Sequence, residues 1–121
     1  MPWSYSQSSG KMTLNGKLVG TGYSGKGDGL NNPGMQDKAR IGPLPQGIYT
    51  IGPAFKHPEK GPVVMRLRPQ RGTQMFGRSG FLIHGDNKAM NHSASNGCII
   101  VGPDIRKQIS ASDDRTLNVT A

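Results

Sequence analysis

The chain of 121 residues is poor in cysteine, aromatic side chains and acidic side chains. Its single cysteine allows no internal disulfide, so one core must hold the domain together. Aromatic residues make up only 6% and are spread along the chain, which argues against a nucleic-acid module that stacks bases. No apolar run is long enough to cross a membrane, and residues 1–10 lack the basic and apolar regions of a signal peptide. We therefore expect synthesis in the cytoplasm and no membrane insertion.

Basic residues outnumber acidic ones by 15 to 7, and the formal net charge of +8 favours an anionic partner. The densest basic stretch is 66–71. On a strand, Val64, Arg66 and Arg68 would share one face, and the odd-numbered residues from 63 to 67 the other. This pattern indicates either a solvated outer face over a buried inner face, or a site for a substrate carboxylate.

Glycine and proline are abundant and interrupt the chain too often for long helices. We predict a mainly β fold in a single domain, 1–121, with Asn15-Gly16 as a hairpin turn. One short helix is expected to begin at Pro103 and to cover the sheet with Ile105 and Ile109. The polar stretch 25–41 is expected to be a surface loop near the site. The predicted strands are 4–8, 11–15, 17–23, 48–52, 63–68, 81–84, 98–101 and 116–120.

The cysteine lies in the segment SNGCII (95–100), which follows IHGD (83–86). A cysteine after glycine and a small polar residue can occupy a tight bend whose N–H groups form an oxyanion hole. His84 lies 14 residues upstream of Cys98, far enough for the two side chains to meet across adjacent strands. The alternative is a small buried cysteine and a core histidine. Papain-like enzymes place the cysteine first, so the order of the two residues disfavours that class.

The pattern His-Gly, a loop, then Ser-x-Gly-Cys-Ile resembles the signature of the L,D-transpeptidase (YkuD-like) catalytic domain, which acts on peptidoglycan stem peptides. The segment GPLPQGIYTI (42–51) is similar to that family's strand entry. Residues 3–10 and 22–25 resemble the branch delivered as antibacterial effectors by type VI secretion systems. The chain has Asn96 where the family usually has histidine and Ile100 where it usually has arginine. We interpret both departures as marks of the effector branch.

The resemblance implies an L,D-transpeptidase-like β-sandwich with one short helix after the cysteine. Cys98 would be the nucleophile and His84 its base, with the imidazole stabilising the thiolate. The carbonyl of Gly85 would orient the imidazole. The amides of Gly97 and Cys98 would form the oxyanion hole. Substrate contacts are expected from Ser95, Asn96, His92 and Tyr23, although Ser95 could equally shape the turn.

The resemblance also implies the reaction and the partners. A stem tetrapeptide would acylate the cysteine. Transfer of the acyl group to water would be L,D-carboxypeptidase trimming, transfer to a D-amino acid would be exchange, and transfer to a second stem would be crosslinking. The enzyme would act in the periplasm of a target cell, with a type VI delivery component and a periplasmic immunity protein as partners.

Other interpretations of the sequence remain open. The ligand types of His84, Asp86, His92 and Cys98 suit zinc, but the close-spaced pairs of known sites are missing, so no metal or other cofactor is expected. The glycine-rich segment 20–26 resembles nucleotide-binding loops but lacks the following helix. A sortase-like transpeptidase would need a downstream arginine, for which Arg106 or Arg115 could serve. A basic binding module without enzymatic activity is the third alternative.

Overall fold

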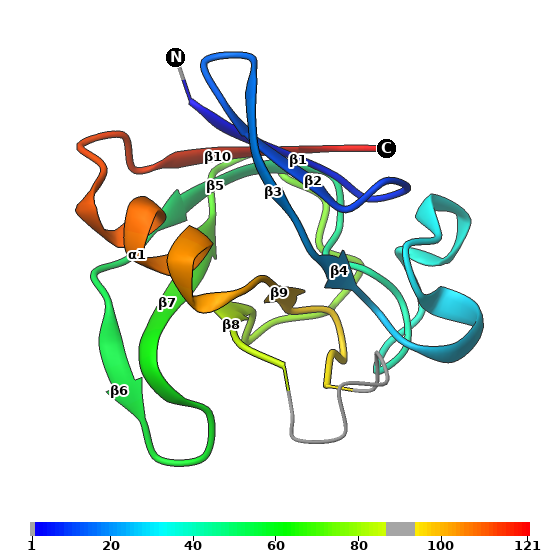
Figure 1. Cartoon of the computed structure of the whole chain (residues 1–121). Coiled ribbons are helices and arrows are strands. Elements are labelled where there is room, and N and C mark those ends of the chain that lie inside the picture. The colour runs from blue at the N-terminus through cyan, green and yellow to red at the C-terminus, as the bar shows by residue number, and fades with distance from the viewer. Residues whose placement is uncertain (1, 87–93) are drawn as a thin grey trace.

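The computed structural model describes residues 2–86 and 94–121, and ten strands and one α-helix lie within them (Figure 1). Two short 3₁₀ turns, η1 (Gly27–Gly29) and η2 (Pro33–Met35), lie in the polar loop. The strands and the helix are β1 (Trp3–Ser6), β2 (Lys11–Leu14), β3 (Lys17–Thr21), β4 (Tyr23–Ser24), β5 (Gly47–Ile51), β6 (Phe55–His57), β7 (Gly61–Pro69), β8 (Leu82–His84), β9 (Ile99–Ile100), α1 (Pro103–Ala111) and β10 (Thr116–Thr120).

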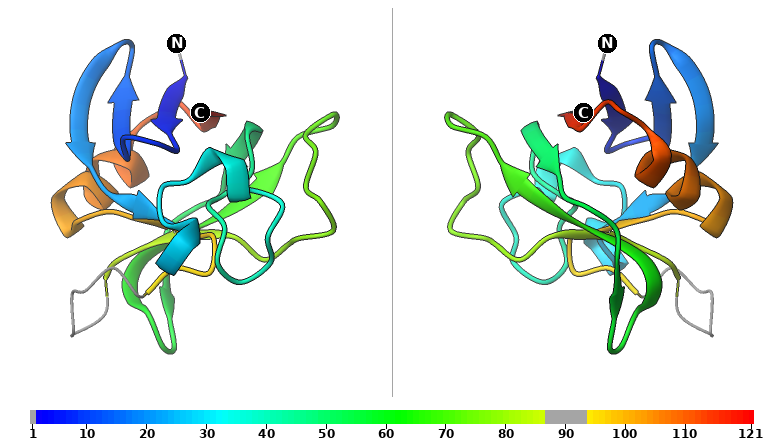
Figure 2. Two further views of the ribbon diagram at one scale, coloured as in Figure 1. Left: turned by 90° about the vertical axis from the view of Figure 1, so that its right-hand side faces the viewer. Right: turned by 90° about the vertical axis from the view of Figure 1, so that its left-hand side faces the viewer.

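The strands form one curled sheet in the order β3-β2-β1-β10-β5-β7-β8-β9-β4, and β6 pairs with β7 outside this path. The two end strands, β3 and β4, follow each other in the chain and are joined by Gly22, so the sheet is barrel-like (Figures 1 and 2). A side chain at Gly22 would collide with the Ile100 carbonyl in β9. The mainly β fold with one helix is confirmed, and the predicted sandwich takes the form of a barrel-like sheet.

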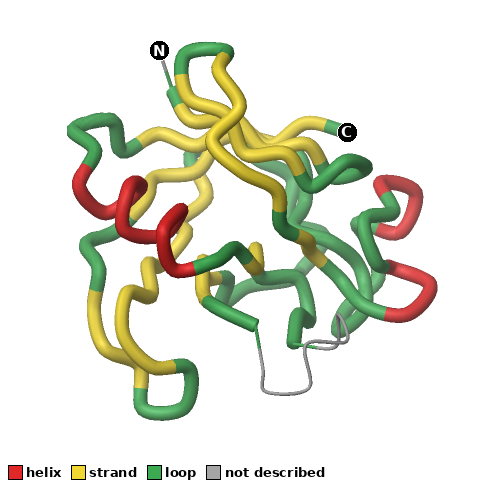
Figure 3. Tube along the Cα trace, in the orientation of Figure 1, coloured by secondary structure: helices red, strands yellow, loops and turns green. Residues whose placement is uncertain are grey.

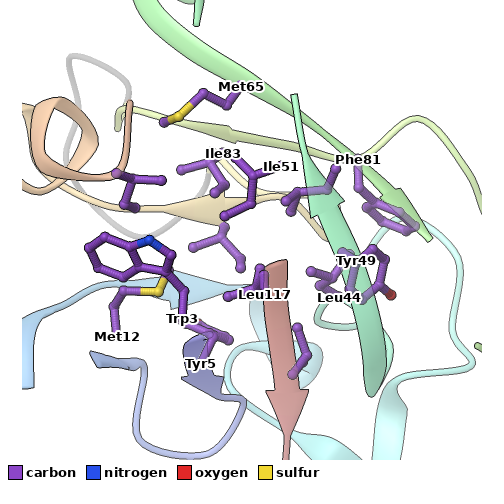
Figure 4. Close-up of a cluster of buried hydrophobic side chains, with 14 of the residues drawn as sticks. Trp3, Tyr5, Met12, Leu44, Tyr49, Ile51, Met65, Phe81, Ile83 and Leu117 are labelled. Carbon is purple, nitrogen blue, oxygen red and sulfur yellow. The ribbon is translucent and has the colours of Figure 1, made fainter. Parts of the chain in front are cut away.

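Alternating side chains of the strands fill the interior of this barrel (Figure 4). Trp3 and Tyr5 of β1 point inward, and the parallel neighbour β10 contributes Leu117 and Val119. Helix α1 has Pro103 in its first turn, as predicted, and buries Ile109 completely. The helix therefore closes one side of the core, in the position that the spacing of its isoleucines indicated.

Strand β6 and its hairpin with β7 were not predicted (Figure 3). The strand has only three residues and lies between Pro53 and Pro58, so it is too short for an alternation of apolar and polar residues to be recognised in the sequence. Met65 and Leu67 of β7 belong to the core, whereas Arg66 and Arg68 are exposed, as the alternation predicted. Val64 pairs with Phe55 of β6 and is buried outside the core cluster.

The remaining predicted strands differ from the observed ones mainly at their ends. The predicted strand 17–23 is divided at Gly22 into β3 and β4, because the chain turns there from one edge of the sheet to the other. The loop 25–41 is confirmed as a connection without strands, and its first residue, Gly25, donates to Ser95 of the cysteine turn. Among the described residues, no helix has the length and apolar character needed to span a membrane.

Candidate active site

Strands β8 and β9 bring the histidine and the cysteine together. The strands are parallel, with Ile83 beside Ile99 and His84 beside Ile100. Ile83 and Ile99 point into the core, so alternation turns the residues on either side of them toward the opposite face. On that face, His84 and the partly exposed Cys98 line one cavity of about 280 Å³. The two side chains thus come from adjacent strands and border one cavity, as the sequence predicted, whereas their catalytic roles stay a prediction.

The imidazole of His84 has a defined orientation. Its Nδ1 lies 2.7 Å from the carbonyl oxygen of Gly85, the partner that the sequence suggested. A carbonyl oxygen only accepts hydrogen bonds, so Nδ1 carries the proton and Nε2 keeps a lone pair. His84 is only 2% exposed, and this burial, reinforced by the charges of Lys60 and Arg106, lowers its pKa to about 4. The base is thus neutral and able to accept a proton at pH 7.

Burial also controls the protonation of the nucleophile candidate. It raises the pKa of the Cys98 thiol above its ordinary value, although the Leu82 N–H that donates to Sγ and the positive charges of Lys60 and Arg78 act in the opposite direction. The resting pair is therefore a neutral thiol and a neutral imidazole, not the thiolate stabilised by imidazole that we expected from the sequence. The low polarity of the site opposes charge separation until the thiol reacts.

Ser95 organises the turn that presents the cysteine. Its hydroxyl donates to the Cys98 carbonyl at 2.6 Å and accepts from the N–H groups of Gly25 (2.9 Å) and Gly97 (3.0 Å). The side chain is completely buried. The predicted substrate contact through Ser95 is therefore wrong, and the alternative of a turn-forming hydroxyl holds.

The expected oxyanion hole also needs a correction. The N–H of Gly97 donates to Ser95, so it is not free to bind an oxyanion. Gly97 is needed for its backbone, because its φ is +132° and a side chain there would collide with Phe81 and Arg78. In contrast, no partner for the Cys98 N–H is found among the described residues, which leaves this group as the available donor of the two.

Asn96 is the expected substrate contact that faces the open site. Its residue is exposed and lines the same cavity as Cys98 and His84. Its backbone carbonyl accepts a hydrogen bond from Arg78, and the residue as a whole lines the cavity. This arrangement agrees with the expected contact, which stays a prediction.

The predicted substrate contact Tyr23 has a different environment. It is 5% exposed, and its hydroxyl donates to Asp86 Oδ1 at 2.7 Å and accepts from the N–H of Ala94 at 3.2 Å. Burial, together with the bond to Asp86, raises the pKa of Tyr23 to about 12. The hydroxyl thus binds within the protein, while the residue lines a larger cavity next to the cysteine. The other predicted contact, His92, lies outside the described residues.

Arg78 holds the cysteine turn through hydrogen bonds, a role that the sequence analysis did not predict. The guanidinium group donates to the carbonyls of Gln36, Pro43, Gly42 and Asn96 at 2.6–3.0 Å. These bonds tie the residue next to Gly97 to the loop 36–43. The sequence showed Arg78 only as one more basic residue, because the burial of an arginine depends on contacts that no local pattern records.

We expect Arg78→Met to lower the free energy of unfolding by about 2–4 kcal/mol, because it leaves buried carbonyl groups without donors. Urea denaturation followed by circular dichroism measures the change. Arg71→Met removes the same charge from an exposed position and serves as the control. A loss no larger than that of the control would contradict the anchoring role.

The other arginines do not form the site that a sortase-like enzyme would need. Arg106 donates to the carbonyls of Val101, Pro62 and Val63, and Arg115 donates to carbonyls at the ends of β5 and α1. In the described part of the chain, neither arginine lines the cavity of Cys98. The described residues likewise contain no group of three or more histidine, cysteine or acidic side chains that could hold a metal ion.

Two solved structures of L,D-transpeptidases share the fold of this chain. The chain aligns with a cysteine-to-serine mutant of the Enterococcus faecium enzyme at a TM-score of 0.60 and 15% identity, covering 98% of this chain and 48% of that one. It aligns with the Mycobacterium smegmatis enzyme at 0.51 and 17%, covering 98% and 58%. The chain thus spans about half the length of these proteins. No curated protein sequence matches it.

The chain thus has the fold of these L,D-transpeptidases (Figure 1), and Cys98 and His84 line one cavity of that fold. Residues 19–119 match the Tlde1 domain. The chain therefore belongs to the Tlde1 domain family. This result confirms the family resemblance that the histidine and cysteine motifs indicated.

Proposed function

We propose that the domain is a cysteine enzyme that cleaves stem tetrapeptides of peptidoglycan, with Cys98 as nucleophile and His84 as general base. The observation that carries this proposal is the shared cavity, which is lined by a partly exposed thiol and by an imidazole whose Nδ1 is held at the Gly85 carbonyl. Membership of the Tlde1 domain family and the L,D-transpeptidase fold support the substrate class.

Acylation follows from this arrangement. As Sγ of Cys98 attacks the carbonyl carbon before the terminal D-residue, the thiol proton passes to Nε2 of His84. The hydrogen bond from Nδ1 to Gly85 holds the ring and stabilises the imidazolium that forms. The Cys98 N–H stabilises the negative oxygen of the intermediate. Collapse breaks the C–N bond, and the imidazolium gives its proton to the departing amine, which leaves a thioester.

Deacylation uses the same groups in reverse order. A water molecule or the amine of a D-amino acid attacks the thioester carbon while Nε2 of His84 accepts its proton. The C–S bond then breaks, and the sulfur takes the proton back from the imidazolium. Water as acceptor gives a shortened stem, whereas a D-amino acid gives an exchanged stem. We propose that trimming, exchange, or both occur here.

Mass spectrometry of muropeptides after incubation of sacculi with the purified protein tests this proposal. Trimming lowers the mass of the tetrapeptide stem by one residue, exchange replaces that residue, and crosslinking joins two stems. Assays with and without an added D-amino acid separate the first two products. Unchanged muropeptides under all these conditions would refute the proposed function.

We also propose delivery of the domain into the periplasm of a target cell, with a type VI component as carrier and a periplasmic immunity protein in the producer. Family membership supports this role. Stem tetrapeptides in the periplasm are donors for crosslinking, so their removal or exchange would weaken the wall. The net charge of +8 suits attraction to a wall that carries stem-peptide carboxylates.

Fusion of the domain to a periplasmic signal sequence should make it toxic to a Gram-negative host. The same domain without the signal should be tolerated, because mature stems lie outside the inner membrane. Viable counts after induction, together with microscopy for swollen or undivided cells, measure the effect. The Cys98→Ala variant with the signal is the matched control. Equal toxicity of this variant, or toxicity in the cytoplasm only, would contradict the proposal.

A further inference from the structure

One lysine belongs to both cavities of the site region. The smaller cavity, of about 280 Å³, contains Cys98 and His84. The larger one, of about 560 Å³, is lined by the next residue, Gly85, together with Asp86. Lys60 lines both of them. It therefore lies where a substrate seated on the cysteine would continue into the larger space.

The hairpin of β6 and β7 places Lys60 at this position. The hairpin extends beyond β8 at the lower edge of the molecule (Figures 1 and 2). At its tip, Nδ1 of His57 accepts hydrogen bonds from the N–H groups of Glu59 (3.1 Å) and Lys60 (3.2 Å). His57, the last residue of β6, thus fixes the backbone of the turn that carries the lysine.

The two cations of the larger cavity differ in what they bind. The N–H groups of Arg106 donate to the carbonyls of Val101, Pro62 and Val63, so this guanidinium already has hydrogen-bond partners within the protein. In the part of the chain that the structure describes, the ammonium of Lys60 has neither an ion pair nor a hydrogen bond, and the residue is exposed. Lys60 is therefore the cation that remains available to a ligand.

The charge of Lys60 also reaches the reacting groups. It lowers the pKa of His84 in the same direction as burial does. It also lowers the pKa of Cys98, where burial acts in the opposite direction. A positive charge at the border of the two cavities attracts an anion that is bound in either of them. This electrostatic effect agrees with the position of Lys60 between the two cavities.

The chemistry of the proposed reaction supplies such an anion. The D-amino acid that leaves the stem carries a carboxylate one carbon away from the reacting nitrogen, and so does a D-amino acid that enters by exchange. We propose that the Lys60 ammonium binds this α-carboxylate, which makes the larger cavity the subsite for the departing or incoming amino acid. This inference rests on the proposed function and assigns the residue that selects a free carboxylate at the end of the stem.

Two synthetic stem tetrapeptides that differ only at the terminus, one with a free carboxylate and one with a carboxamide, test the inference. We expect the wild-type protein to cleave the carboxylate form with a kcat/KM about 10- to 100-fold higher, as one charge-assisted contact predicts. In Lys60→Met this ratio should fall to about one, and Lys60→Arg should restore part of it. Lys56→Met, an exposed lysine in the same hairpin, should keep the wild-type ratio.

The ratio separates carboxylate binding from the general effect of the lysine charge on Cys98 and His84, because that effect acts on both substrates alike. A wild-type ratio near one, or a ratio unchanged in Lys60→Met, would overturn the role of Lys60 and leave the proposed function intact. A wild-type protein that cleaves neither peptide would instead overturn the proposed function, and with it this inference.

Discussion

Cys98→Ala is expected to abolish the processing of stem tetrapeptides, with a loss of about 10³-fold or more in kcat/KM. Removal of the sulfur leaves no atom that can form the thioester, so neither trimming nor exchange can proceed. Cys98→Ser should leave little activity, because a hydroxyl is far less acidic than a thiol and the same imidazole activates it poorly. Mass spectrometry of muropeptides, followed over time, measures all three proteins.

The fold provides the control for this experiment. Cys98 lies at a partly exposed turn outside the core cluster, so its replacement by alanine should change the free energy of unfolding by about 1 kcal/mol or less. Circular dichroism and urea denaturation check that the variant is folded. A folded Cys98→Ala protein with near-normal turnover would remove the cysteine mechanism and favour a binding module without enzymatic activity.

His84→Ala should reduce kcat/KM by about 10²- to 10⁴-fold, because the neutral thiol then has no base to accept its proton. The pH profile of the wild-type protein gives an independent measure of the same group. Burial lowers the pKa of His84 to about 4, so the imidazole stays neutral above that pH. Activity should therefore persist well below pH 6.5, the pKa of an ordinary histidine, and fall only as the pH approaches about 4.

Acid conditions also affect the fold through the same histidine. The unfolded chain binds a proton at this group near pH 6.5, whereas the folded chain does so only near pH 4. The contribution of His84 to stability is therefore complete above pH 6.5 and is lost as the pH falls through this window. Denaturation midpoints at each pH distinguish unfolding from titration of the base. An acid limb near pH 6.5 in a fully folded protein would contradict the buried, neutral base.

Local patterns were sufficient for the main elements and for the two residues of the candidate active site. Pro103 and the spacing of Ile105 and Ile109 located the helix, because caps and periodicity act within a single turn. The His-Gly and Ser-x-Gly-Cys segments identified His84 and Cys98. Glycine after the histidine and glycine before the cysteine reflect short-range geometry, which sequence records directly.

Long-range contacts decided the roles of the supporting residues. Ser95 was assigned to the substrate because its sequence neighbours do not show that Gly25, far away in the chain, donates to its hydroxyl. The N–H of Gly97 was assigned to the oxyanion hole, but Ser95 already accepts it. The hydroxyl of Tyr23 binds Asp86, while the residue lines the larger cavity, so its substrate contact stays a prediction. Each of these hydrogen-bond partners depends on the packing of other elements.

The sequence by itself determined a mainly β domain, the helix at 103–111 and the pair of Cys98 and His84, because these features follow from periodicity, turn chemistry and one local motif. Only the tertiary structure decided that Gly22 closes the sheet, that Arg78 anchors the cysteine turn and that Lys60 reaches both cavities. It also decided that the resting pair is neutral. Burial, and the partners that burial requires, arise from segments distant in the chain, so no local pattern contains them.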